Sequence, residues 1–259
     1  MFRFLLTRRW IGLFLVVIVV GFTCVELGLW QFRRYHERQH SNAVTTTNLK
    51  AAPIAVSGIL STNAEPASGD EWRVVRTTGT YDAKHQVVVL YRSVNSQPGI
   101  EVVVPLVTPS GTAVLVDRGW VPSVTNGNLD QHPPAPPAGR VTVTGWVRID
   151  ATDASNLVTP VGGAVRSISA AAIKTTLPYP AYDGFVALIK EQPSVKNAPL
   201  KSGGPDLGSG PYFFYGVQWF FFALLGFGFW CYFGWAEYQE VLRARAAPDQ
   251  VREPVTAAE

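Results

Sequence analysis

The chain has 259 residues, with 22 Lys and Arg against 19 Asp and Glu and a formal net charge of +3. A charge this balanced, with no Lys/Arg run in the middle of the sequence, argues against a nucleic-acid partner. The mean hydropathy of +0.12 is high for a soluble protein, and it comes from two apolar runs, one near each end. About 175 residues lie between the runs, which is enough for one domain with its own hydrophobic core.

The first apolar run, residues 10–29, is broken only by Thr23 and Glu26. At about 1.5 Å per residue it is long enough to cross a hydrocarbon core of about 30 Å as one helix. Trp30 then lies at headgroup depth, and three arginines follow within two turns: Arg33, Arg34 and Arg38. The run is longer than the core of a signal peptide and no small-x-small cleavage site follows it, so we predict a retained transmembrane helix over residues 10–35.

The second apolar run, residues 212–236, is rich in aromatic side chains and contains four glycines. A helix that served only as an anchor would not need this composition, whereas flat rings and small residues suit close packing against other helices. Gln218 lies at membrane depth and needs a hydrogen-bond partner there. We therefore predict a second transmembrane helix that contacts either the first helix or another membrane protein.

Two spans place both chain ends on the same side of the membrane. The positive-inside rule is undecided, because arginines flank both ends of the first run. Long domains translocate largely regardless of charge, so we expect the short tails, residues 1–9 and 237–259, in the cytoplasm and residues 36–211 outside it. Only nine residues precede the first run, which leaves no room for a mitochondrial presequence, and the predicted location is the bacterial plasma membrane.

Between the two runs the pattern changes to that of β-strands. After a polar linker at residues 41–51, short stretches rich in Val and Thr are bounded by turn residues: 72–81, 86–91, 100–107, 112–116, 141–147 and 185–191. Pro105 indicates an edge strand or a bulge, and residues 167–177 are the one convincing helix. The predicted fold class is a membrane-anchored all-β domain, an antiparallel β-barrel or sandwich with one short helix, flanked by two transmembrane helices.

The two cysteines, Cys24 and Cys231, lie inside the two apolar runs. In helices that run in opposite directions their depths would differ by roughly 20 Å. A disulfide needs Cα atoms within about 7 Å. We therefore predict free cysteines that pack as small side chains, and neither a disulfide nor a paired copper site.

Convergent catalytic groups are not evident in the sequence. The middle segment has no Cys, no G-x-S-x-G and no phosphate-binding loop, so we do not expect an enzyme. His85 and His132 fall in predicted turns and are expected to be exposed. His36 and His40 are four residues apart just after the first run and would share a helix face. That spacing suits a metal or haem iron, and it equally suits two interfacial polar residues.

Several residues can be given a structural role from their residue type and position. Gly28 permits close contact between helices, and Trp30 suits a membrane interface. Arg118, at the end of a strand and before a loop, is suited to hold a carboxylate or to cap one end of the domain. The segment Arg118, Gly119 and Trp120 is equally well read as a corner that stabilises the fold and as a binding surface.

Five short motifs follow one another in order along the chain. They are Leu27, Gly28, Trp30, Gln31 and Arg34; Gly79, Thr80, Tyr81 and Asp82; Arg92, Gly99 and Pro105; residues 114–122, VLVDRGWVP; and Tyr215, Gln218 and Trp219. By these motifs the chain resembles the surfeit locus protein 1 family, the assembly factors of haem–copper cytochrome c oxidase, as an actinobacterial-type member. The one departure within VLVDRGWVP is Asp117, which stands where the family usually has Asn.

The resemblance implies a protein that docks to cytochrome c oxidase subunits and acts at or near haem a insertion. A stable accessory subunit of the respiratory complex remains an open alternative. A second alternative, from another functional class of protein, is a carrier that binds haem a itself. Bacterial relatives are thought to use a His just before the Tyr of the last motif, but this chain has Tyr212 there, so its donors would be Tyr212, His36 and His40. No cofactor is predicted.

Overall fold

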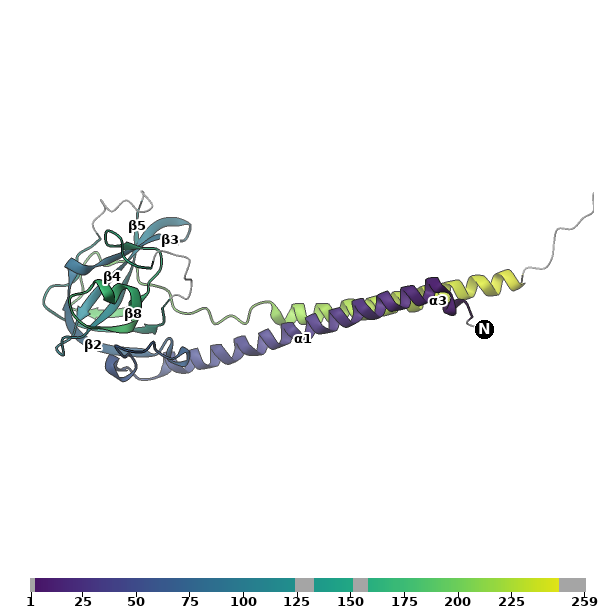
Figure 1. The fold of residues 1–259 in the computed structure, drawn as a ribbon, viewed down its shortest axis with the longest axis horizontal. Helices are drawn as coiled ribbons and strands as arrows, with labels where there is room; N and C mark the ends of the chain where they lie inside the picture. The colour runs from purple at the N-terminus through teal and green to yellow at the C-terminus, as the bar shows by residue number, and fades with distance from the viewer. Residues whose placement is uncertain (1–2, 124–132, 151–157, 247–259) are drawn as a thin grey trace, which may run out of the picture. The chain divides into compact units, whose positions relative to one another are not determined.

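The computed structural model describes residues 3–123, 133–150 and 158–246 (Figure 1). These residues form two compact units. The helical unit comprises Met1–His40 and Gly208–Glu259, and the β-unit comprises Ser41–Leu207. His132, which the sequence places in an exposed turn, lies outside the described residues.

Two long helices dominate the helical unit. After the 3-10 turn η1 (Arg3–Leu6), α1 runs over Arg8–Lys50, and α3 runs over Tyr212–Ala246. Both are long and apolar enough to cross a membrane. Only 11% and 6% of their most apolar windows are buried, so neither is the core helix of a soluble domain.

The polar linker predicted at residues 41–51 is wrong, because α1 continues through it to Lys50. Local bonds support the extra turns. The Thr47 hydroxyl donates to the carbonyl of Ala43, one turn back. The Asn48 amide donates to the carbonyls of Gly69 and Glu71. A polar, Thr-rich sequence is thereby helical, because contacts within the β-unit outweigh its weak intrinsic propensity.

Within the helical unit, α1 and α3 pack antiparallel. Phe32 of α1 packs edge-on against Phe213 near the start of α3, with ring centroids 5.8 Å apart. At the opposite end, Trp10 lies 6.2 Å from the ring of Trp230 and donates its indole N–H to Glu237 over 2.9 Å. α1 therefore begins at the end of the helix pair where α3 ends.

Small residues bring the two helices together, as their aromatic and glycine content indicates. A Cβ built on Gly28 would lie 2.7 Å from the ring of Phe220, and one on Gly216 would lie 3.1 Å from Phe32. Cys24 is buried, Cys231 is exposed, and both are free. The prediction of free cysteines agrees with the structure, but the prediction that both pack as small side chains holds only for Cys24, because Cys231 is exposed.

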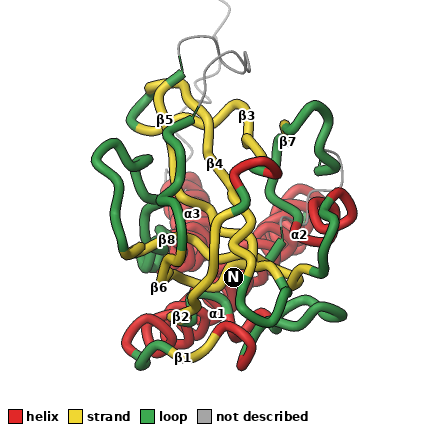
Figure 2. Tube along the Cα trace, turned by 90° about the vertical axis from the view of Figure 1, so that its left-hand side faces the viewer, coloured by secondary structure: helices red, strands yellow, loops and turns green. Residues whose placement is uncertain are grey.

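The β-unit is built on one eight-stranded mixed sheet (yellow in Figure 2). Its strands are β1 (Ile54–Ala55), β2 (Val74–Tyr81), β3 (Val87–Val94), β4 (Gln97–Val107), β5 (Ala113–Pro122), β6 (Arg140–Arg148), β7 (Ala164–Val165) and β8 (Ala181–Gln192). Their order is β1-β2-β6-β8-β5-β4-β3-β7, and β2 also pairs with β4 at Thr80 and Tyr81. The sheet therefore curls back on itself. The six predicted strands are confirmed, although β5 extends to Pro122.

The predicted antiparallel arrangement is confirmed only in part, because among the described residues five strand pairs are antiparallel and three are parallel. β8 lies between β5 and β6, antiparallel to β6 and parallel to β5. Because β5 and β6 run in opposite directions, any strand inserted between them must be parallel to one of them. The short strands β1 and β7 also pair in parallel, with β2 and β3.

Pro105 lies in an interior strand, so the edge-strand alternative is wrong; the other alternative, a bulge, is met only nearby, because the register shift between β4 and β5 lies at Val102 and Val103. β4 pairs with β5 through Pro105 and Leu115, and the carbonyl of Pro105 accepts from the N–H of Asp82. The nitrogen of Pro105 therefore points to the connection between β2 and β3, where the ladder needs no donor.

Two apolar cores lie on the two faces of the sheet, because side chains alternate along each strand. Val104, Val116 and Val186 enter the larger core, whereas Val103 and Leu115 enter the second. This explains why β4 and β5 read as continuous apolar runs rather than as alternating ones.

Helical turns cover the second core and the loops. α2 (Ala170–Ile173) and η5 (Lys174–Thr176) occupy the predicted helix at residues 167–177, and Ala170 and Ile173 pack into the second core. Three further 3-10 turns are η2 (Val56–Gly58), η3 (Ser68–Asp70) and η4 (Ala83–His85).

We expect Gly28→Leu to weaken the contact between α1 and α3, because the new side chain would overlap the ring of Phe220. Overpacking of this kind costs about 1–3 kcal/mol. The readout is a lower thermal unfolding midpoint of the full chain in detergent, together with less cross-linking between the two helices. The matched control is Gly12→Leu, because no atom of the described residues lies within 4 Å of a Cβ at Gly12. Equal effects of both changes would contradict the packing role of Gly28.

Candidate functional site

The motif at the end of β5 holds the segment that leads from β8 towards α3. We call residues 196–207 the return segment. The N–H groups of Trp120 and Leu200 each donate to the other's carbonyl, over 2.7 and 2.8 Å. Gly119 has φ +117°, and a Cβ there would lie 2.2 Å from the carbonyl oxygen of Leu200. Only glycine permits this approach of the two backbones.

Asp117 adds a side-chain link between β5 and the return segment. Its carboxylate is 3% exposed and accepts from the Ser202 hydroxyl over 2.7 Å and from the Gly119 N–H over 2.9 Å. Burial, together with the nearby charge of Glu101, raises the pKa of Asp117 to about 6, and the two hydrogen bonds offset only part of this shift. The group therefore titrates in mildly acidic conditions.

Arg118 forms a buried ion pair. Its side chain is fully buried, and its Nη2 donates to Glu191 of β8 over 3.1 Å. Nη1 donates to the carbonyl of Pro134, and the Tyr81 hydroxyl donates to the second oxygen of Glu191 over 3.0 Å. Burial, reinforced by the charge of Glu191, raises the pKa of Tyr81 well above its ordinary value, so the phenol stays a donor. Arg118 thus holds a carboxylate, one of the two roles expected for it.

Trp120 connects this motif to the β3–β4 hairpin. Its side chain is 7% exposed, and its indole N–H points to the carbonyl of Arg92 at 3.5 Å. A Cβ on Gly99 would lie 2.3 Å from the same indole nitrogen. Two motifs that are separate in the sequence, that of Arg92 and Gly99 and that of Trp120, therefore meet at one place. The side chains of Arg118 and Trp120 lie inside the unit, out of reach of a partner.

The Gly79–Asp82 motif ends in a hydrogen-bonded cluster. Asp82 accepts from the Tyr179 hydroxyl over 2.7 Å and contacts Nδ1 of His85 at 2.6 Å. Partial burial by itself raises the pKa of Asp82, but the hydrogen bonds from Tyr179 and His85 outweigh it and leave that pKa below its ordinary value. His85 lies in the turn η4, as predicted, but it is a partly buried partner of Asp82 rather than an exposed residue.

In α1 the motif residues point in two directions. Gly28 is buried against α3, and Leu27 is half-buried. Trp30 is 47% exposed, and Arg34 is exposed beside Glu37 at 3.3 Å. The side-chain oxygen of Gln31 is buried and has no hydrogen-bond partner among the residues that the structure describes.

In α3 the motif residues flank the contact with α1. Gly216 is buried against Phe32, whereas its neighbour Tyr215 and the polar Gln218 are exposed. Trp219 is half-buried and packs edge-on against Phe222. Tyr215 and Gln218, three residues apart, therefore lie on a surface of α3 that α1 leaves open within the helical unit.

The donors considered for haem lie near one end of the helical unit. Tyr212 begins α3, and Tyr35, next to His36, packs 5.7 Å from Phe213. Imidazole and phenol are suitable iron ligands in kind. However, His36 and His40 are both exposed, and a haem site buries its iron ligands in an apolar pocket. These residues do not fit a haem site in this structure.

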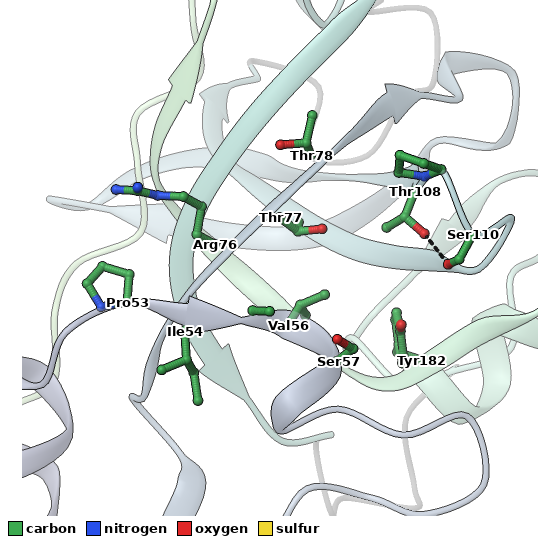
Figure 3. A pocket seen from close by; sticks show the side chains of 12 residues that line it. Pro53, Ile54, Val56, Ser57, Arg76, Thr77, Thr78, Thr108, Ser110 and Tyr182 are labelled. Atoms are coloured by element: carbon green, nitrogen blue, oxygen red, sulfur yellow. Dashed lines mark hydrogen bonds between the residues drawn. The ribbon is translucent and has the colours of Figure 1, made fainter.

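An open cleft of about 650 Å³ lies between β1 and the turn after β4 (Figure 3). Thr77, Thr78, Thr108 and Ser110 contribute hydroxyl groups to its wall, and the Thr108 and Ser110 hydroxyls are bonded to each other over 2.8 Å. β2 pairs with β1 only as far as Arg76 and with β4 only from Thr80. The cleft therefore lies where β2 has no strand partner on that side.

Together these features define a β-unit carried by two apolar helices, with motif residues inside the β-unit and on the helix pair. The sequence model of the SURF1 family matches residues 18–224. The chain therefore belongs to the SURF1 family, whose members are known in general as cytochrome c oxidase assembly factors.

Relatives come from bacteria and from eukaryotes. An uncharacterised SURF1-like protein of Mycobacterium tuberculosis is 29% identical over 262 residues, which cover 98% of this chain and 93% of the relative. A SURF1-like protein of Dictyostelium discoideum is 30% identical over 126 residues, 47% of this chain and 46% of the relative. A SURF1-like protein of Monosiga brevicollis is 27% identical over 157 residues, 56% and 55% of the two chains.

Sequence reasoning missed the partners of the motif residues. Glu191 lies 73 residues after Arg118, and Tyr179 lies 97 residues after Asp82. The one available signal was an arginine in β5 and a glutamate in β8, two strands in which apolar side chains predominate. Which of them pair depends on strand order, which the sequence pattern does not specify.

We expect Gly119→Ala to release the return segment, because its Cβ overlaps the Leu200 backbone. The matched control is Gly111→Ala, which also has positive φ but no atom of the described residues within 4 Å of the new Cβ. The control should cost about 1–2 kcal/mol for the backbone conformation alone, and Gly119→Ala at least about 2 kcal/mol more for two lost hydrogen bonds. Denaturant unfolding, with amide hydrogen exchange at Leu200, measures the difference. Equal costs would rule out the proposed contact.

We expect Asp117→Asn to remove a pH dependence of stability. The folded pKa of about 6 exceeds the ordinary 3.8, so the folded state binds the proton more tightly and the free energy of unfolding falls as pH rises from about 4 to about 6. The full shift corresponds to about 3 kcal/mol. At pH 7.5 the variant should be more stable than the wild type, and at pH 4 the difference should vanish.

Thermal unfolding midpoints across this pH range test the expectation. The control is Glu65→Gln, which neutralises an exposed carboxylate of the same unit. An unchanged pH profile in Asp117→Asn would show that Asp117 is not the titrating group.

Proposed function

We propose that this protein is a membrane-anchored assembly factor of haem–copper cytochrome c oxidase. It docks to oxidase subunits, acts at or near haem a insertion, and catalyses no reaction of its own. Membership of the SURF1 family supports the link to the oxidase. The antiparallel helix pair, in which α1 begins where α3 ends, supports a multi-pass membrane protein with both termini on one side. We place it in the bacterial plasma membrane, with cytoplasmic termini and an extracytoplasmic β-unit.

The observation that carries the docking proposal is the open motif surface on α3. Gln218 is an exposed polar residue in the apolar part of α3. In a lipid environment its amide has no water to bond, so a polar group of a neighbouring transmembrane helix is its natural partner. Tyr215, three residues earlier and also exposed, enlarges the same surface. We propose that an oxidase subunit packs here.

The motif residues of the β-unit take a different role in this proposal. Arg118 and Trp120 are buried, so they shape the unit and position its return segment rather than touch the oxidase. The oxidase is then contacted by exposed residues of the β-unit and by the α3 surface. A substitution at Arg118 would act through the fold.

The alternative of a haem a carrier has less structural support. It would need His36, His40 or Tyr212 as ligands, and both histidines are exposed. No step of the proposed function passes through a haem bound to this chain. In this proposal haem a is bound by the oxidase subunit to which the protein docks, and not by this chain.

We expect the tagged full chain, purified from bacterial membranes in mild detergent, to retain oxidase subunits below one copy per chain. Gln218→Leu should reduce that yield several-fold, since one interhelical polar contact is worth about 1 kcal/mol. Its own folding should be unaffected, because the change is to a lipid-compatible side chain on an exposed position. The control is Val217→Leu, the exposed neighbour on the same helix. Subunit identification and a visible spectrum are taken on the same sample.

The other outcomes separate the alternatives. A yield of one oxidase per chain would indicate a stable accessory subunit. Haem a that remains after the oxidase is washed away, and disappears with His36→Ala or Tyr212→Phe, would indicate a haem carrier. Failure to recover any oxidase subunit would contradict the assembly role, and equal losses in Gln218→Leu and Val217→Leu would contradict the proposed α3 surface.

A further inference from the structure

A second, smaller pocket opens at the outer part of the sheet. It has a volume of about 290 Å³ and is lined by Leu90, Tyr91 and Arg92 of β3 and by Arg166, which directly follows β7. β3 and β7 are paired in parallel at the end of the strand order, which brings the two arginines to one place. The volume is below the usual range of drug-sized or cofactor sites and suits a small group.

The charge of this pocket is positive. Arg92 donates its Nε to Glu101 over 2.8 Å, which leaves its two terminal nitrogens for another acceptor. Arg166 lies over the ring of Tyr91, 4.9 Å from its centroid, and has no carboxylate partner among the residues that the structure describes. Arg92 is therefore balanced by Glu101 and, at longer range, by the charge of Asp117, whereas the positive charge of Arg166 has no carboxylate partner among the described residues.

A bulge in β3 sets the position of the Tyr91 ring in this pocket. Tyr91 has φ +59°, an unusual conformation for a bulky residue, and lies at the register shift between Val89 and Arg92. This bulge leaves the Tyr91 ring 56% exposed, beneath Arg166. Trp120 fixes the other side, because its indole points to the carbonyl of Arg92. Residues held in sparsely populated backbone conformations cluster at functional sites, and here one lies under Arg166 and next to Arg92 in the chain.

We propose that Arg92 and Arg166 bind a phosphate group against the ring of Tyr91. The planar forks of two guanidinium groups on neighbouring strands suit a tetrahedral oxyanion, which offers acceptor oxygens to both. A carboxylate, with two oxygens, would be satisfied by one of them. The source of the phosphate is either a free anion or an anionic lipid headgroup. This site is independent of the proposed contact with the oxidase on α3.

The test uses the full chain in an uncharged detergent at constant ionic strength. Inorganic phosphate is titrated in one arm, and in the other the micelles are doped with short-chain phosphatidic acid or, for comparison, phosphatidylcholine. Calorimetry measures binding. Arg166→Gln should weaken it about tenfold or more, because a charge-assisted contact is lost, while the thermal midpoint stays unchanged because the residue is exposed.

Matched variants decide the outcome. Arg76→Gln removes an exposed arginine of β2 at the cleft of Figure 3 and should leave binding within about twofold of the wild type. Tyr91→Phe should also bind normally, because the ring that supports Arg166 remains. Saturable binding of inorganic phosphate identifies a free anion, and binding of phosphatidic acid alone identifies a headgroup. Absence of saturable binding in both arms, or equal loss in Arg166→Gln and Arg76→Gln, overturns the proposal.

Discussion

The ion pair of Arg118 and Glu191 is the constraint around which the β-unit is arranged. Both groups lose water on folding, and that loss is offset only if each donor and acceptor finds a partner. The Pro134 carbonyl and the Tyr81 hydroxyl supply those partners, so β2, β5, β8 and the segment before β6 meet at one point. The contacts among the surrounding valines are apolar and do not depend on orientation. The hydrogen bonds to Arg118 therefore give the relative placement of these strands a specificity that apolar burial alone lacks.

Immediately beyond that ion pair, a single residue joins two parts of the β-unit. Trp120 pairs through its backbone with Leu200 of the return segment, and through its indole with the carbonyl of Arg92. The return segment and the β3–β4 hairpin, which carries the cationic pocket, are thereby held by one residue, the first through its backbone and the second through its ring.

The motifs of this family member divide into two kinds by burial. In the β-unit, Arg118, Gly119, Trp120 and Tyr81 lie inside, where they satisfy buried charges or permit close backbone approach, whereas Arg92 is exposed at the cationic pocket. Those of the helices are split, with Gly28 and Gly216 turned towards the neighbouring helix and Tyr215 and Gln218 exposed. A residue that belongs to a family motif therefore need not lie on a contact surface. The exposed residues of α3 are better suited to recognise a partner than the buried Arg118.

The sequence by itself determined the two apolar helices, the strand-rich segment between them, the free cysteines and the family, because each is expressed in local composition, periodicity or a short motif. It did not determine that residues 41–50 are helical, that β8 lies parallel to β5, or that Pro105 is interior, since all three depend on contacts with distant segments. The same holds for the site. Arg118 was recognisable from its motif, but Glu191 became its partner only when strand order placed β8 beside β5.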